Sequence, residues 1–123
     1  MKKIFAVCFL FLLASCSKKD PVVFCEGTDT DGKPVKIGKV FTTGMITVYG
    51  KFSSPFGTEN VTIKLYDTED GDILPEETQS VKVDPLAKTV RTDFLIINES
   101  SYKAVVEGKD GSVLGEGHVK ILE

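Results

Sequence analysis

The sequence predicts an all-β protein, a single antiparallel β-sandwich of about seven strands. Apolar and polar side chains alternate in short segments, as in residues 61–66, where Val61, Ile63 and Leu65 share one face. Glycine, proline, aspartate and asparagine separate these segments about every eight to twelve residues, a spacing typical of sandwiches. Apolar residues do not recur at helical spacing over three turns in residues 16–123, so no long helix is expected.

The first half of this region is expected to form strands at 22–25, 35–41, 45–52 and 61–66. Residues 26–34 contain three acidic side chains, two glycines and a proline, and this composition predicts a loop. Pro55 and Gly57 predict a turn before the last of these strands. The faces of the 45–52 strand hold Ile46, Val48 and Phe52 on one side, and Met45, Thr47 and Tyr49 on the other.

The second half continues in the same way. An acidic turn at 67–72 leads to strands expected at 81–83, 89–97, 102–107 and 113–122. Lys109-Asp110-Gly111 predicts a hairpin turn, because Asp-Gly tolerates the positive φ angles of tight turns. In the 89–97 strand Val90, Thr92 and Phe94 share one face, and in the 102–107 strand Tyr102, Ala104 and Val106 alternate with Lys103, Val105 and Glu107. Val119 and Ile121 of the last strand are expected to face inward.

The segment 99–104, Glu-Ser-Ser-Tyr-Lys-Ala, resembles the start of the penultimate strand of immunoglobulin-like domains. There a tyrosine commonly stands two positions before a cysteine or small residue, and its hydroxyl bonds to backbone upstream. The resemblance implies that Tyr102 is this corner tyrosine. The chain has no tryptophan, and Ala104 stands where antibody domains have cysteine. The likeness is therefore to the wider Ig-like or fibronectin-like group of sandwiches.

The N-terminus has the three parts of a bacterial secretory signal. Met1-Lys2-Lys3 is basic, residues 4–13 are apolar, and Leu13-Ala14-Ser15-Cys16 follows. Ten apolar residues rise only about 15 Å as a helix, too little for a bilayer core of about 30 Å. The last four residues resemble the lipobox of bacterial lipoproteins. In that family the cysteine thiol receives a diacylglycerol, a peptidase cuts before it, and the new amine is usually acylated as well.

This resemblance divides the chain into a lipoprotein signal peptide at 1–15, a lipidated tether at 16–21 and a sandwich domain at 22–123. It implies acyl chains such as palmitate on Cys16 and the membrane as a partner, since two or three chains give stable anchoring. Ser17 follows the cysteine where aspartate would resemble an inner-membrane retention signal. We therefore expect a cell-envelope lipoprotein, on the outer membrane if the cell has two, facing the periplasm or the exterior.

The mature chain is acidic. Loss of Lys2 and Lys3 with the signal leaves thirteen basic and eighteen acidic side chains, a net charge of −5. Nucleic acids attract basic faces through counterion release, so no nucleic-acid partner is expected. A protein or an envelope polymer remains as a candidate ligand, besides the membrane itself.

The three cysteines have different expected fates. Cys8 leaves with the signal and Cys16 becomes a thioether, so Cys25 has no partner within the chain. Its thiol could join two chains or form a mixed disulfide. The favoured interpretation is a small, buried, apolar side chain in the first strand.

No metal or cofactor is expected. A structural zinc site needs four ligands, and Cys25 and His118 do not supply them; His118 is expected on the outward face of the last strand. Residues 27–32 match a calcium-binding EF-hand loop at three positions but lack its acids at the first and twelfth, where Gly27 and Gly38 stand. Residues 67–72 have a different spacing. Both segments are interpreted as solvated turns, with weak cation binding as an alternative.

A separate hypothesis concerns Met45, Tyr49 and Tyr66, which could form an exposed patch on the outward faces of two strands. Packing of these side chains against neighbouring strands is the alternative.

The functional expectation is a non-enzymatic binding or structural module. The chain has one histidine and no Gly-x-Ser-x-Gly motif, which gives little support to a serine hydrolase. Residues 22–27 resemble the opening of a family of small lipoprotein lysozyme inhibitors, and this implies a periplasmic inhibitor with a β-barrel as the alternative. The second cysteine and the Ser-Gly motif of that family are missing. A small hydrolase is a third hypothesis.

Overall fold

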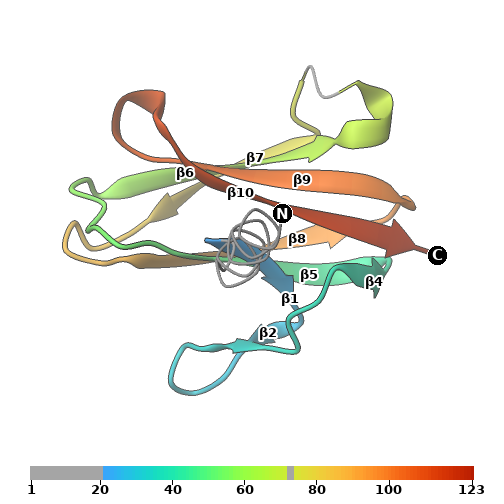
Figure 1. Ribbon diagram of the computed structural model, residues 1–123, viewed down its shortest axis with the longest axis horizontal. Helices are drawn as coiled ribbons and strands as arrows, with labels where there is room; N and C mark the ends of the chain where they lie inside the picture. The colour runs from blue at the N-terminus through green and yellow to red at the C-terminus, as the bar shows by residue number, and fades with distance from the viewer. Residues whose placement is uncertain (1–20, 72–73) are drawn as a thin grey trace, which may run out of the picture.

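The computed structural model describes residues 21–71 and 74–123, which form a β-sandwich (Figure 1). The expected signal peptide and Cys16 lie outside the described residues, as does the tether up to residue 20. Because the described residues form a β-sandwich, the predicted all-β fold class is confirmed. Among the described residues, no helix is long and apolar enough to cross a membrane.

Two sheets face each other, with β6, β7, β9 and β10 above β1, β5 and β8 in Figure 1. The smaller sheet has the order β1-β5-β8 and is antiparallel throughout. The larger sheet has the order β4-β10-β9-β6-β7, and its β4–β10 pair is parallel. The strand bounds are β1 Val22–Cys25, β5 Gly44–Lys51 and β8 Thr89–Ile96 in the smaller sheet, and β4 Val40–Thr42, β6 Asn60–Asp67, β7 Glu77–Lys82, β9 Ser100–Glu107 and β10 Val113–Leu122 in the larger.

A two-stranded hairpin, β2 Gly27–Thr28 with β3 Pro34–Val35, lies outside the two sheets at the bottom of Figure 1. Two short 3₁₀ turns complete the described elements, η1 at Thr68–Asp70 and η2 at Lys109–Gly111. The second is the predicted hairpin turn, with Asp110 at φ 60° and Gly111 at φ 74°. Both residues therefore have the positive φ that the Asp-Gly pair was expected to supply.

Alternation within the strands produces the core. Every second residue of a strand points to the same face, so each long strand delivers a row of apolar side chains to the space between the sheets. Val119 and Ile121, expected to face inward, are buried. The row of Val90, Thr92 and Phe94 and the row of Tyr102, Ala104 and Val106 face the core as well, with Thr92 half-buried and Val105 buried in addition. The largest fully buried side chains are Phe24, Phe94, Ile63, Ile121, Val22, Val48, Val61 and Val106.

The backbones of the two sheets are in close contact where β1 passes β10. A Cβ atom on Gly117 would lie 2.4 Å from the Val22 carbonyl oxygen, closer than real contacts allow. Glycine at this position therefore lets the backbone of β1 rest directly on β10. On the opposite side of the sandwich, the Gln79 side chain of β7 bridges to β8. Its Nε2 donates to the Asp93 carbonyl oxygen at 2.8 Å, and its Oε1 accepts from the Thr92 hydroxyl.

Two expected strands are wrong in their extent, and the loop expected at 26–34 contains β2 and the first residue of β3. The single strand predicted at 35–41 is divided between β3 and β4, which belong to different sheets. Lys36 has a left-handed backbone with φ 56°, and the Gly38 amide donates to the Phe24 carbonyl oxygen, so the chain turns there. The strand predicted at 81–83 begins earlier, at Glu77, because an edge strand with exposed polar residues pairs through its backbone without showing apolar alternation.

Candidate functional site

An open groove of about 1100 Å³ lies at the end of the smaller sheet, where β1 begins and β5 ends. Tyr49 and Lys51 of β5 and Val23 of β1 contribute to its floor. Val23 and Tyr49 are direct partners across the antiparallel pair, so their side chains lie side by side on one face. Ile46 and Val48 of the same strand are buried in the core, and Tyr49 and Lys51 therefore belong to the outer face of the sheet.

One wall of the groove is the segment 52–56, which follows β5. The Phe52 and Phe56 rings meet edge to face, with centroids 5.8 Å apart and planes at 67°. The Phe52 amide donates to the Lys88 carbonyl oxygen at 2.9 Å, and the Phe56 amide donates to that of Ala87 at 3.0 Å. These backbone hydrogen bonds and the ring contact hold the wall against the segment that precedes β8.

The opposite wall comes from the β2–β3 hairpin, which presents Lys33 and Pro34 to the groove. The Asp29 carboxylate shapes this hairpin, because its Oδ1 accepts the backbone amides of Asp31 and Lys33, each at 2.9 Å. This is an Asx-type turn, in which an aspartate side chain replaces a backbone partner. The acidic segment considered above as a calcium loop thus uses its central carboxylate to position Lys33. Among the described residues, no group of three or more His, Cys, Asp or Glu is placed to hold a metal ion.

The lining of the groove is mostly apolar, and its charge is of one sign. Pro21, Ile37, Pro55 and Leu114 add to the apolar side chains of the floor and walls, and Ser53 and Ser54 are uncharged polar residues of the lining. Of the residues that the structure describes, the charged ones in the lining are Lys33 and Lys51, both exposed, in a chain whose net charge is −3. Pockets that bind small molecules are typically of this kind, apolar with a few polar groups that orient the ligand.

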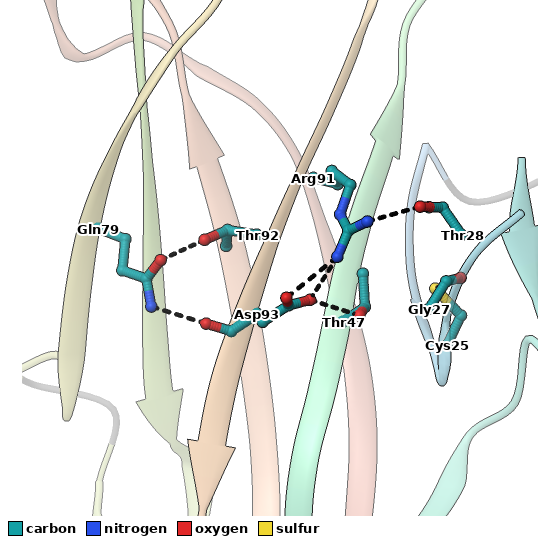
Figure 2. Close-up of polar contacts among 8 residues, drawn as sticks. All are labelled: Cys25, Gly27, Thr28, Thr47, Gln79, Arg91, Thr92 and Asp93. Atoms are coloured by element: carbon teal, nitrogen blue, oxygen red, sulfur yellow. Dashed lines mark hydrogen bonds and ion pairs between the residues drawn. The ribbon is translucent and has the colours of Figure 1, made fainter. Parts of the chain in front are cut away.

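A polar cluster lies next to the groove on the same outer face (Figure 2). Arg91 of β8 is the cross-strand partner of Tyr49, and its Nη2 contacts both carboxylate oxygens of Asp93, at 2.9 and 3.0 Å. Its Nη1 donates to the Thr28 hydroxyl at 2.6 Å, which ties β8 to the β2–β3 hairpin across β5. The guanidinium therefore fixes the hairpin that forms one wall of the groove.

Asp93 in turn holds Arg91 in place. Its Oδ1 accepts the Thr47 hydroxyl at 2.5 Å. This hydrogen bond lowers the pKa of Asp93 below its ordinary value of 3.8, and the hydrogen bond and charge of Arg91 add to the effect while partial burial opposes it. The carboxylate is thus ionised and keeps the arginine oriented across the pH range in which most proteins work.

The β2–β3 hairpin also covers Cys25. This side chain is fully buried, and its Sγ donates to the Gly27 carbonyl oxygen at 3.3 Å. Burial raises the pKa of the Cys25 thiol above its ordinary value of 9.0, and the hydrogen bond to Gly27 offsets part of this rise. The expectation that Cys25 is a buried, apolar side chain is therefore confirmed.

Other residues singled out from the sequence lie apart from the groove. His118 is on the outward face of β10 as expected, with 64% of its side chain exposed and Nε2 3.5 Å from Glu116 Oε1. The hypothesis of a shared patch is wrong, because Met45 and Tyr49 lie on β5 of the smaller sheet and Tyr66 lies on β6 of the larger. The Lys103 ammonium lies over the Tyr66 ring, 5.3 Å from its centroid.

The groove itself was missed by sequence reasoning. Its lining comes from segments between Pro21 and Leu114 that are far apart in the chain, so no local sequence motif predicts the groove. The available signal was the pair of aromatic residues in 52–56 beside proline, which was interpreted only as a turn.

Comparisons with known proteins add information on the fold. No family model matches the chain, and no curated protein matches it. Among solved structures, the soluble domain of PmoD from Methylocystis sp. ATCC 49242 (Rockwell) is similar, with a TM-score of 0.50 and 10% sequence identity. The match covers 82% of this chain and 89% of that chain. At this identity the similarity concerns the sandwich fold alone.

Proposed function

We propose that this chain is a lipid-anchored lipoprotein of the cell envelope whose sandwich is a non-enzymatic binding module, with the groove as its binding site. Acyl chains on Cys16 anchor it, on the outer membrane where the cell has two membranes. The basic start, the apolar run and Leu13-Ala14-Ser15-Cys16 support the anchor.

One observation carries the binding role. The described sandwich presents a largely apolar, open groove whose charged lining is entirely basic, on a chain that is acidic overall. Leaving such a surface in water costs free energy, and a ligand that covers it recovers that cost. The hydrogen bonds from Arg91 and Asp29 hold the hairpin wall in place, so the site is formed before a ligand arrives.

The anchor is tested by expressing the full chain in a two-membrane bacterium and determining the mass of its N-terminal peptide. We expect a peptide that begins at Cys16 and carries two or three acyl chains. The Cys16→Ser variant should retain Met1 and carry no lipid. A native protein with Met1 intact, or with a free thiol at position 16, would contradict the anchor.

The binding role is tested with envelope extracts passed over the immobilised lipoprotein. Ile37 is 57% exposed and lines the groove, whereas Leu95 is 59% exposed and lies outside it. We expect Ile37→Asn to lose a component that the wild type and Leu95→Asn both retain. Equal retention by all three proteins would remove the groove from the proposed function.

The inhibitor hypothesis has a direct test of its own. The described residues form a two-sheet sandwich rather than the barrel that the resemblance to lysozyme inhibitors implied. We expect the lipoprotein to leave lysozyme activity unchanged at a large molar excess. Stoichiometric inhibition would replace the present proposal with that of a periplasmic inhibitor.

A further inference from the structure

We propose that the groove binds one anionic phospholipid drawn from the membrane on which the protein is anchored. An acyl chain lies along the apolar part of the floor, Val23 and Tyr49, and against Phe52 of the wall, and the headgroup phosphate lies at Lys33 and Lys51. The source of the lipid rests on the proposed anchoring, whereas the chemistry of the ligand rests on the groove alone.

The lining selects an amphiphile with a negative charge. Apolar side chains from β1, β5 and the 52–56 segment line the groove, and the two lysines come from different elements, Lys33 from the β2–β3 hairpin and Lys51 from the end of β5. Among the described residues, the lining contains no carboxylate, although the whole chain has eighteen acidic side chains and fifteen basic ones. An apolar ligand without charge would leave this local excess of positive charge unmatched.

The position of the groove favours a lipid over a soluble ligand. Pro21, the first described residue, lines the groove itself. It follows Cys16 by five residues, which reach at most about 18 Å even when fully extended. An acylated Cys16 therefore keeps Pro21, and with it this part of the groove lining, within that distance of the bilayer interface, where anionic phospholipids are present.

The shape of the groove also suits a chain that enters from the side. The groove is open, and Ile37 and Leu114 on its lining are 57% and 37% exposed. A bound acyl chain would cover these side chains without any movement of the sandwich. The two lysines are exposed and so can reach a headgroup that stays in the interfacial layer.

The test uses the lipoprotein produced from the full chain and reconstituted in phosphatidylcholine vesicles. The vesicles contain a small fraction of photoactivatable phosphatidylglycerol or, in a parallel sample, photoactivatable phosphatidylcholine. After irradiation, mass spectrometry locates the adducts. We expect adducts in two groove peptides, one that contains Ile37 and one that contains residues 49–56. The adduct yield should be roughly tenfold higher for the anionic probe than for the neutral one.

Matched variants separate charge from apolar contact. Lys33→Glu with Lys51→Glu should reduce labelling by the anionic probe to that of the neutral probe. Lys120→Glu, an exposed position on β10 outside the groove, should leave the yield unchanged. Ile37→Asn should lower the yield with both probes, whereas Leu95→Asn should not. Circular dichroism of each variant confirms that the sandwich is intact.

Several outcomes would overturn the proposal. These are equal labelling by the two headgroups, adducts located outside the groove, and preferential labelling by a photoactivatable free fatty acid. An absence of adducts in the groove would also overturn the lipid proposal, and it would favour a protein as the ligand. If the N-terminal peptide lacks acyl chains but the groove is still labelled by anionic lipid in mixed micelles, the anchor fails while the lipid site stands.

Discussion

The Tyr102 hydroxyl donates a hydrogen bond of 2.8 Å to the carbonyl oxygen of Asn98. The bond joins the buried start of β9 to the connection that leaves β8, four residues upstream. The Tyr102 side chain is only 5% exposed, so the hydroxyl would otherwise be short of a partner. This is the arrangement expected of a corner tyrosine, and that expectation is confirmed.

Replacement of Tyr102 by phenylalanine removes this hydrogen bond and keeps the buried ring. We expect the free energy of unfolding to fall by about 1 kcal/mol, the usual net contribution of such a bond. Urea denaturation followed by circular dichroism measures the change. Tyr66→Phe is the control, because the ring that faces Lys103 remains and stability should change by less than about 0.5 kcal/mol. Equal effects of the two substitutions would argue against a special role for the Tyr102 hydroxyl.

Gly117 is expected to be intolerant of any side chain. An added Cβ would meet the Val22 carbonyl oxygen at 2.4 Å, and backbone cannot move aside as a flexible side chain can. We expect Gly117→Ala to destabilise the domain by about 1–3 kcal/mol, the range for overpacked sites. Gly27→Ala is the matched control, since nothing lies within 4 Å of its added Cβ. Thermal melting of both variants measures the difference, and an unaffected Gly117→Ala would contradict the close crossing of β1 over β10.

The hydrogen bonds of Asp93 should make stability depend on pH in the acid range. Its pKa is lowered in the folded protein, chiefly by the Thr47 hydroxyl, so the ionised carboxylate stabilises the fold. This stabilisation is complete above the unfolded pKa of about 3.9 and is lost as the pH falls through the folded value. Denaturation midpoints of the wild type should therefore decrease as the pH drops below about 4.

Two variants test this assignment. Asp93→Asn should be less stable than the wild type at neutral pH and should lose part of the acid dependence. Thr47→Val keeps the buried volume but removes the hydroxyl, so the folded pKa of Asp93 should move back toward its ordinary value. If Asp93→Asn kept the full acid dependence of the wild type, the effect would belong to other carboxylates.

The Cys25 thiol should react with reagents only when the β2–β3 hairpin opens. Arg91 secures that hairpin through Thr28, a hydrogen bond to a charged group. We expect Arg91→Ala to speed modification of the native protein by an aromatic disulfide by roughly tenfold, since the opening costs less. Lys88→Ala, an exposed change outside this cluster, should react as slowly as the wild type. A rate unchanged in Arg91→Ala would show that the thiol is protected by other contacts.

Much of the fold could be predicted because apolar and polar residues alternate along the long strands. In β6 the apolar residues Val61, Ile63 and Leu65 recur at every second position, and in β10 Val119 and Ile121 do so. The observed bounds of both strands agree with the predicted ones to within one residue. Prediction failed where pairing depends on backbone alone. Glu77 to Ser80 give no apolar alternation, and Val35 and Ile37 are exposed although their types suggested a buried strand.

The candidate site was less accessible to sequence reasoning for a different reason. The lone thiol of Cys25 could be placed in the interior because its residue type and its short apolar strand agree. The groove, in contrast, depends on which segments meet at one end of the sheet. Lys33 and Lys51 line the same groove only because the β2–β3 hairpin packs against β5. The expected lipidation of Cys16 remains a prediction for the N-terminal peptide experiment.

The Gln79 side chain has a consequence beyond holding two strands together. β8 is an edge strand of the smaller sheet. Backbone carbonyl groups on such an edge can accept hydrogen bonds from a strand of another molecule, above all beside an exposed apolar residue such as Leu95, which is 59% exposed. The Gln79 amide occupies the Asp93 carbonyl oxygen from within the same molecule, so this acceptor is not available to a strand of a second copy.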